Sequence, residues 1–352
     1  MESSNAIQKQ GAGKLLILGI QHMFAMFGAT VLVPLITGLN PAVALFAAGI
    51  GTWIFHLVTG RKVPVFLGSS FAFMGAIVAV TQIYSNGAEV GTAAYTAALP
   101  YATGGIMVAG GLYLVLALLV KIFGADTIRS FFPPVVTGPV IITIGLMLAP
   151  VAISGISTPV EIGAVTFPLW INWVVAFVTI AAIVVVSIFV KGFFKLVPIL
   201  IGIAVGYIAA LLAGIVDFAP IQASKWLAVP SFFLPKFEMK AILLIAPIAI
   251  VTFVEHIGDV VANGAVVGQD FVKKPGLHRT LMGDGIATMF AGAIGGPANT
   301  TYSENTGVLA ATKNYNPLTL EIAACFAIVM SFIGKFSGFL QTIPGPVMGG
   351  VS

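Results

Sequence analysis

Two carboxylates stand out because their surroundings are apolar. Glu255 lies within residues 240–261 and Glu304 within residues 299–312, where other charges are few. An ionisable side chain at membrane depth costs roughly 2.5 kcal/mol or more on insertion scales, so it usually persists only where it faces a cavity, a partner or a solute. Because water is scarce there, a carboxylate can hold and release a proton as well as accept hydrogen bonds. The pair therefore predicts a substrate site inside a bilayer, with Glu255, Glu304 or Asp259 as a proton carrier.

The composition indicates a polytopic membrane protein. The chain is 59% hydrophobic and 8% charged, whereas soluble domains carry about 25% charged residues. Its only cysteine, Cys325, excludes an intramolecular disulfide and a cysteine-based metal cluster. The basic residues are scattered through the predicted loops, which argues against nucleic acid as a partner. Neither a His-Glu-x-x-His zinc motif nor the Gly-x-Gly-Asp pattern of intramembrane aspartyl proteases occurs, so we expect no enzyme, no bound metal and no cofactor.

Hydropathy, with Gly and Pro as breaks, predicts the membrane spans. They fall at residues 14–36, 41–59, 64–82, 101–123, 132–153, 168–190, 196–216, 240–261, 279–296, 299–312 and 318–342, and another begins at Pro344. The first apolar segment follows no signal-peptide cleavage site, so we expect it to be retained. With a cytoplasmic amino terminus, three cations lie outside, at Lys225, Lys236 and Lys240, and Lys335 lies within a span. The inner side then holds Lys9, Lys14, Arg61, Lys62, Lys121, Arg129, Lys191, Lys195, Lys273, Lys274, Arg279 and Lys313.

An internal repeat predicts the architecture. Ser69-Ser70-Phe71-Ala72-Phe73 recurs as Thr300-Thr301-Tyr302-Ser303-Glu304, and Pro64 recurs as Pro297, at a nearly constant offset of about 230 residues. A repeat of seven spans must be inverted in the membrane, which is typical of secondary transporters with a site near the midplane. By this arithmetic the second copy, which starts near residue 238, looks truncated.

Residues 64–73 and 297–304 are predicted to be broken spans. Each opens with proline, gathers hydroxyl and aromatic residues, and turns helical only later. Such backbone is tolerated at membrane depth only where protein buries it or it lines a watery cavity. Two half-helices meeting there would direct free N–H groups and positive dipole ends at one point. The alternative is that proline and glycine merely kink ordinary helices.

Four motifs resemble those of one transporter family. The run from Glu304 through Asn305 and Gly307 to Thr312-Lys313 is similar to the signature of the nucleobase-ascorbate transporter family, also called nucleobase-cation symporter 2. Gln21-His22, the stretch from Gly68 to Phe73, and Glu255-His256-Ile257-Gly258-Asp259 resemble that family's other motifs in the expected order. The resemblance covers essentially the whole chain and is strongest to the bacterial uracil permeases.

The resemblance implies an all-α membrane fold of two inverted seven-span repeats, divided into a core and a gate domain. Residues 1–123 and 238–343 would form the two halves of the core domain, and residues 124–237 the first half of the gate domain. Residues 344–352 would begin span twelve in a truncated second gate half, so this chain is not expected to transport as it stands. A homodimer of the complete protein is also implied.

The implied substrate site lies between the broken spans and the eighth span. Its residues would be Glu255, Glu304, the backbone around Phe73 and Ser303, and Tyr302 beside them. Gln21, His22, Asn305 and Thr312 would support the site, with His22 holding Asp259 or Asn305 in place. The uracil members often carry histidine where this chain has Asp259, and close relatives carry glycine where it has Ser303.

The function implied is proton-coupled uptake of uracil across the bacterial cytoplasmic membrane by alternating access, driven by the proton gradient. Uracil presents alternating N–H and carbonyl groups, which two carboxylates and helix-opening N–H groups complement. Two acids do not choose between one ring and two, so xanthine or another purine is the main alternative. An anion exchanger or a channel of similar fold is less favoured. Outside the site, His56 is expected at the membrane interface, His256 in packing, and Asp284 in a structural hydrogen bond or a proton relay.

Overall fold

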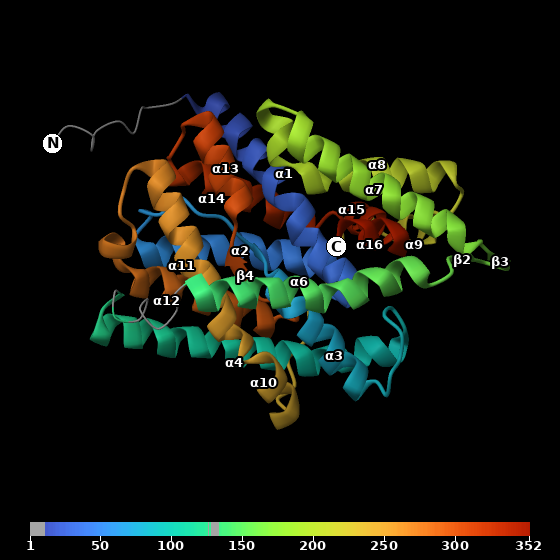
Figure 1. Cartoon of the computed structure of the whole chain (residues 1–352), viewed down its shortest axis with the longest axis horizontal. Coiled ribbons are helices and arrows are strands. Elements are labelled where there is room, and N and C mark those ends of the chain that lie inside the picture. The colour runs from blue at the N-terminus through green and yellow to red at the C-terminus, as the bar shows by residue number, and fades with distance from the viewer. Residues whose placement is uncertain (1–10, 126, 128–133) are drawn as a thin grey trace.

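The chain is mostly helical in a computed structural model that describes residues 11–125, 127 and 134–352. Lys9 and Arg129, two of the cations counted on the inner side, lie outside the described residues, as does the predicted start of the fifth span at residue 132. Figure 1 shows the helices gathered around α1 (Ala12–Thr37), which runs through the middle of the molecule.

One group combines helices from the amino-terminal part of the chain with helices that follow residue 238. It contains α1, α2 (Pro41–Thr59), α3 (Met74–Tyr84), α4 (Ala93–Phe123), α10 (Met239–Ile245), α11 (Ile248–Val267), α12 (Leu277–Ala293), α13 (Ser303–Thr312) and α14 (Pro317–Ser331). Within it, α12 packs between α4 and α2, and α14 packs between α2 and α1. Glycines allow these close approaches: a Cβ at Gly292 would lie 2.8 Å from the Met107 nitrogen in α4.

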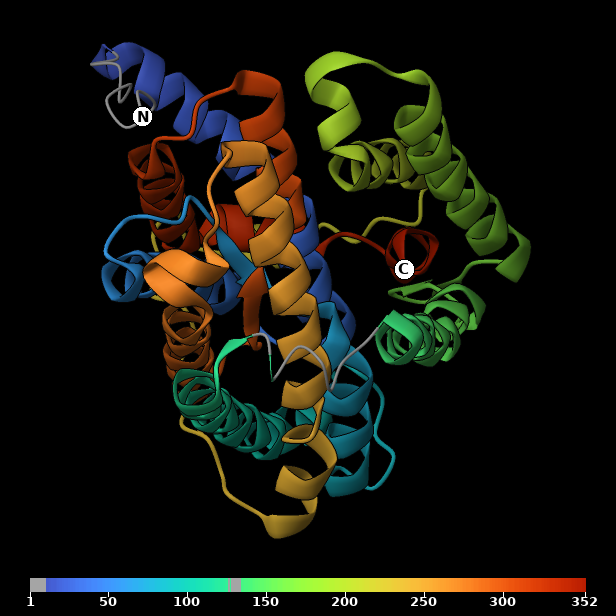
Figure 2. The same cartoon turned by 60° about the vertical axis from the view of Figure 1, so that its left-hand side comes forward.

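A second group lies beside the first, as Figure 2 shows. It contains α6 (Pro134–Ser157), α7 (Leu169–Phe189), α8 (Pro198–Leu212) and the final helix α16 (Gly345–Val351), which packs against the other three. A Cβ at Gly350 would lie 2.7 Å from the Ala176 carbonyl oxygen, so only glycine fits this contact. The assignment of these two groups to a core and a gate domain stays a prediction, as does their separate movement.

Short elements connect these helices. They are the hairpin β2 (Glu161–Ile162) and β3 (Val165–Thr166), the turns η2 (Gly192–Leu196) and η3 (Val272–Gly276), and the helices α9 (Ala219–Ala223) and α15 (Gly334–Gln341). In the part of the chain that the structure describes, the helices long and apolar enough to cross a membrane are Gly13–Thr37, Pro41–Thr59, Ala93–Phe123, Leu169–Phe189 and Met239–Val267. These helices support a multi-pass membrane protein.

Two span boundaries differ from the prediction. The fourth span was expected to begin at residue 101, but α4 begins at Ala93, where Thr92 caps it by accepting a hydrogen bond from the Tyr95 N–H at 3.3 Å. Pro100 lies inside this helix and does not end it. The eleventh span was expected to be continuous, but α14 and α15 are separate, because Ile333 between them pairs with Leu227 of an extended segment.

Both predicted broken spans are extended at first and helical afterwards. The first consists of β1 (Leu67–Ser69), the 3₁₀ turn η1 (Phe71–Phe73) and α3, and the second consists of β4 (Asn299–Thr301) and α13. The short extended stretches are therefore confirmed, and simple kinked helices are excluded at these positions. The fourteen-span count and the inverted seven-span repeats stay predictions.

Candidate functional site

The centre of the site is a pair of short strands from distant parts of the chain. Strands β1 and β4 are antiparallel, with the partners Leu67 and Thr301, Gly68 and Thr300, and Ser69 and Asn299. Two further backbone bonds extend the pairing, from the Ser70 N–H to the Ala298 carbonyl at 2.8 Å and from the Tyr302 N–H to the Phe66 carbonyl at 3.0 Å. The strand pair satisfies backbone polar groups that would otherwise be exposed at membrane depth.

Hydrogen bonds to the first two helices hold β1 in place. The Ser69 hydroxyl donates to the Thr30 carbonyl of α1 at 2.9 Å. The Leu67 N–H donates to the Thr52 hydroxyl of α2 at 2.9 Å. All four residues are buried, so both bonds form away from water. The hydroxyl-rich sequence around the strand is therefore used for positioning it.

Tyr302 joins the two broken spans. Its hydroxyl donates to the Ser69 carbonyl at 2.8 Å, and its ring lies where any Cβ at Gly68 would be. Gly68 is thus required because the tyrosine ring crosses directly over the strand. With its phenol buried and already bonded, Tyr302 acts here as a brace for the strand pair, and direct contact with a solute stays a prediction.

The two helices that follow the strands begin without side-chain caps. Neither the start of η1 at Phe71 nor the start of α13 at Ser303 receives a capping hydrogen bond from a side chain. The first N–H groups of a helix have no partner within the helix, and this end carries a partial positive charge. Because β1 and β4 are antiparallel, both helix starts lie at the strand pair and the helices run apart. The structure thus places two groups of N–H donors close together, near Phe73 and Ser303.

Three carboxylates lie beside these helix starts. Glu304 is the second residue of α13, and Glu255 and Asp259 are one turn apart on the same face of α11. All three are partly buried, and Glu255 lies within electrostatic range of both Asp259 and Glu304. The structure therefore places the two glutamates and Asp259 in one region, and their joint role in binding a solute stays a prediction.

The carboxylates differ in the donors that they already bind. Asp259 Oδ2 accepts a hydrogen bond from the Thr301 hydroxyl of β4 at 2.7 Å. Within residues 11–125, 127 and 134–352, no protein donor binds the Glu255 carboxylate, and Glu304 interacts only with its own backbone N–H. Buried acceptors are normally satisfied by a partner. The two glutamates therefore remain available to N–H groups of a solute.

The predicted supporting residues have different surroundings. Asn305 Nδ2 donates to the His22 carbonyl at 2.9 Å and lies 3.2 Å from His22 Nδ1, so this pair joins α13 to α1 as expected. The Gln21 side-chain oxygen is buried without a protein partner among the described residues. Thr312 donates to the Val308 carbonyl within its own helix at 2.8 Å. Its effect on the site is therefore limited to the end of α13.

The sequence did not reveal two polar contacts near the site. Thr301 is the donor to Asp259, and its only signal was the hydroxyl shared by the two repeats. His256 lies on the face of α11 away from Glu255, where Nδ1 is 3.1 Å from Asp284 Oδ2 and Nε2 is 3.0 Å from the Thr280 hydroxyl. His256 and Asp284 thus join α11 to α12, which agrees with the structural reading of Asp284.

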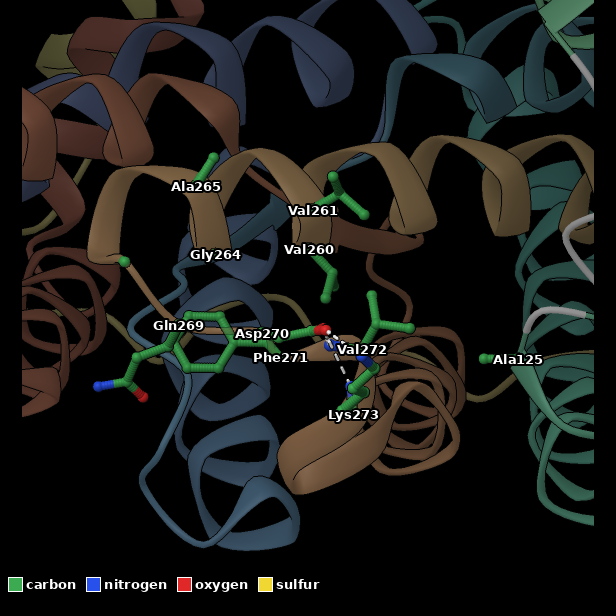
Figure 3. Close-up of a pocket in the computed structure, with 11 residues that line it drawn as sticks. Ala125, Val260, Val261, Gly264, Ala265, Gln269, Asp270, Phe271, Val272 and Lys273 are labelled. Carbon is green, nitrogen blue, oxygen red and sulfur yellow. Dashed lines mark hydrogen bonds and ion pairs between the residues drawn. The ribbon is translucent and has the colours of Figure 1, made fainter. Parts of the chain in front are cut away.

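A cavity at the end of α11 does not contain these carboxylates. Its volume is about 720 Å³, and it lies where the end of α11 meets the loop before α12, as Figure 3 shows. Val260 and Phe271 line it, and Asp270 Oδ1 accepts hydrogen bonds there from the Val272 and Lys273 N–H groups at 3.1 and 3.2 Å. Asp270 is thus used in the loop turn. Polar groups converge at the strand pair instead, which is where we place the candidate site.

Comparison with known proteins identifies the family. The model of the permease family matches residues 13–352. A probable uracil permease of Pasteurella multocida is 46% identical over 346 residues, which cover 97% of this chain and 78% of that protein. The uracil permease of Bacillus caldolyticus is 43% identical over 346 residues, covering 97% of this chain and 76% of that protein. The chain belongs to this permease family.

The permease is thus a transporter rather than an enzyme, and the family resemblance drawn from its motifs is confirmed. Its fold is also similar to that of the transmembrane domain of BicA, a cyanobacterial bicarbonate transporter, with a TM-score of 0.74 at 17% identity. That match covers 98% of this chain and 88% of the other. At such low identity the similarity concerns the fold alone.

Proposed function

We propose that this permease takes up a nucleobase, with uracil as its first substrate, and that protons drive the uptake. The observation that carries the proposal is the pair of Glu255 and Glu304, which lie beside two uncapped helix starts and, among the described residues, bind no donor except the Glu304 backbone N–H. Relatives at 46% and 43% identity are named a probable uracil permease and a uracil permease, which supports the same substrate here.

The chemistry of uracil complements this set of groups. Its ring N–H groups would donate to the glutamates, and its carbonyl oxygens would accept from backbone N–H groups near Phe73 and Ser303. Phe73 is fully buried, so its ring supports the helix start while its backbone lies nearer the solute. A site built from both donors and acceptors rejects analogues that lack the matching group, because its buried polar groups are then unpaired.

Two alternative substrates are separable by this chemistry. A purine such as xanthine offers the same kinds of edge and differs mainly in size, so it remains the second candidate. An anion such as bicarbonate, the solute in the name of the transporter BicA with its similar fold, would be repelled by three carboxylates at close range. We therefore place anion exchange well below nucleobase uptake.

Proton coupling requires a carboxylate that gains and loses a proton during the cycle. Asp259 is our first choice of carrier, because Thr301 already holds its carboxylate while the glutamates are free for the solute. Protonation of Asp259 would change its hydrogen bond with Thr301 of β4 and would thereby affect the strand pair. Movement of the α11 and α13 group past the α6–α8 group would then expose the site to each side in turn.

Membrane placement completes the proposal. The bias of basic residues supports a cytoplasmic amino terminus, and we place the protein in the bacterial cytoplasmic membrane. We also expect a homodimer of the kind that the family resemblance implies.

The test is uptake of radiolabelled uracil by cells that lack their own permease and express the whole gene that encodes this chain. Binding of uracil to the purified chain is measured alongside, with xanthine, uric acid and ascorbate as competitors. We expect saturable binding that uracil competes best, and uptake that a protonophore abolishes. Uptake indifferent to the protonophore would remove the proton coupling and leave the substrate assignment intact.

A pair of variants isolates the site. Glu255→Gln removes one acceptor charge and should abolish binding and uptake while the protein still inserts into the membrane. Glu89→Gln makes the same change at an exposed loop residue and should leave both unchanged. Normal uracil binding by Glu255→Gln would remove Glu255 from the site.

A further inference from the structure

A groove on the outside of the helix bundle lies between α2 and α14, away from the strand pair. Its volume is about 370 Å³. On the α2 side it is lined by Trp53 and Leu57, which are one turn apart on the helix, and by Arg61, which follows the helix end at Thr59. Leu318, Ile322 and Cys325 line it on α14 with the same kind of spacing. The two rows form an apolar channel with a cation at one end.

The cation is presented to the groove by a helix end. Gly60 and Arg61 both have positive φ values, of 66° and 54°, and the Arg61 N–H donates to the His56 carbonyl at 2.7 Å. This turn ends α2 and directs the Arg61 side chain back along the groove. Arg61 Nε contacts Glu321 Oε1 at 2.9 Å, while two thirds of the side chain (66%) is exposed. The guanidinium is therefore fixed through one nitrogen and leaves its terminal N–H groups free.

The apolar part of the groove faces outward. Leu57 is 70% exposed and Leu318 is 44% exposed. In a protein whose long helices cross the bilayer, such side chains contact lipid. The indole N–H of Trp53 donates to the Glu321 carbonyl at 3.3 Å, so the ring is held against both helices. From Trp53 to its end at Thr59, α2 rises about 9 Å along its axis, which matches part of an acyl chain below a headgroup.

We propose that this groove binds an anionic phospholipid. The phosphate would pair with the free side of the Arg61 guanidinium, and one acyl chain would lie between Leu57 and Ile322 and reach Trp53. Guanidinium groups bind phosphate through paired N–H donors, which is the contact that the terminal nitrogens of Arg61 offer. The side of the membrane is the one that the positive-inside count assigns to the cytoplasm, where anionic lipids attract basic residues.

The headgroup end of the groove is connected to the candidate substrate site. Glu321, which binds Arg61, also lies 3.2 Å from His56 Nδ1, and His56 Nε2 donates to the Val65 carbonyl at 2.9 Å. Val65 directly precedes the residues that pair with β4. His56 was expected at the membrane interface. Its side chain is buried within the protein, where both ring nitrogens have protein partners. A bound lipid would therefore contact the same network that positions β1.

Fluorescence of Trp53 provides the test, and it needs no transport assay. The other three tryptophans, at 170, 173 and 226, are replaced by phenylalanine, and the protein is placed in bilayers containing dibrominated lipid, which quenches tryptophan on contact. Brominated phosphatidylglycerol is compared with brominated phosphatidylcholine. We expect brominated phosphatidylglycerol to bind beside Trp53 about fivefold more strongly than brominated phosphatidylcholine, which is the effect of one cation near the membrane surface.

Matched variants locate the preference. Arg61→Gln should bring the ratio close to one, whereas Lys121→Gln, which removes an exposed cation at the end of α4, should leave it unchanged. Cys325→Phe fills the apolar part of the groove without changing charge, and it should reduce quenching by both lipids.

Several results would overturn the proposal. Equal quenching by the two lipids would do so, as would a preference that survives Arg61→Gln or quenching that Cys325→Phe does not reduce. An excess of free glycerol phosphate should leave the ratio unchanged. Loss of the preference in its presence would show that the site takes the soluble phosphate and not the lipid.

Discussion

The two broken spans share one backbone arrangement and place different chemistry at its ends. Each consists of a three-residue strand followed by an uncapped helix start, and the strands pair with each other. At the corresponding positions of the repeat, the first span has Phe73 and Met74, which are apolar and buried, whereas the second has Glu304 and Asn305. One half thus supplies N–H donors and an apolar wall, and the other adds an acceptor and a polar brace.

This difference shows which features the repeat retains. Strand pairing and free N–H groups belong to the backbone, so they tolerate many side chains provided that glycine lies where Tyr302 crosses. The acceptors of the site must come from side chains. A single acid at the start of α13, Glu304, is enough, because α11 supplies Glu255 and Asp259. A site between unlike halves can bind a solute whose two edges differ.

The largest expected effect comes from exchanging the acceptor. Glu304→Gln keeps the shape of the side chain but loses the charge, and loss of a hydrogen bond to a charged group should weaken uracil binding between roughly 10-fold and 100-fold. Phe73→Leu keeps the backbone donor in the other span and should weaken binding less. Isothermal titration of both purified variants measures the difference. Equal losses would mean that the two halves contribute alike.

The next prediction concerns the proton. The second span reaches a carboxylate of α11 through the bond from Thr301 to Asp259. Asp259→Asn can still accept that bond but cannot exchange a proton, so uracil binding should change by less than about threefold while accumulation against a gradient is lost. Thr301→Val, which leaves the acid in place, should retain some protonophore-sensitive uptake. Concentrative uptake by Asp259→Asn would assign the proton to one of the glutamates.

A smaller effect is expected on stability. Asn305→Ala removes the bond to His22 that only the second helix start possesses, and it should lower the free energy of unfolding by about 1–3 kcal/mol because the histidine carbonyl is left buried. Thr312→Ala serves as its control at the end of the same helix, since that hydroxyl bonds only to the Val308 carbonyl and the Asn314 N–H and reaches no other helix. Thermal unfolding in detergent compares them. Equal shifts in melting temperature would contradict a special role for the brace.

The smallest effect is expected at Ser303. Its side chain is exposed and caps nothing, so Ser303→Gly should change uracil affinity by less than about twofold. The glycine enlarges the space at the helix start and should let xanthine compete more strongly. Competition binding with both bases measures this change. A variant that loses uracil binding would show that the hydroxyl itself contacts the solute.

Much of this arrangement is predictable from local sequence. The apolar runs predict most helices, and the proline, hydroxyl and aromatic pattern predicts both broken spans, because these residues act on their own backbone. Helix limits are less predictable: Pro100 reads as a boundary but lies inside α4, and Ile333 interrupts an apolar run because it pairs with Leu227. A boundary set by a distant partner has no signal near it in the chain.

The sequence by itself determined that the chain crosses a membrane, that two acids lie in apolar segments, and that two segments echo each other. These follow from composition and spacing, which need no knowledge of contacts. Only the tertiary structure decided that Asp259 binds Thr301, that Tyr302 braces β1, and that Arg61 reaches a lipid-facing groove through Glu321. Each of these depends on residues far apart in sequence, and hydrogen bonds between them form only after the helices have packed.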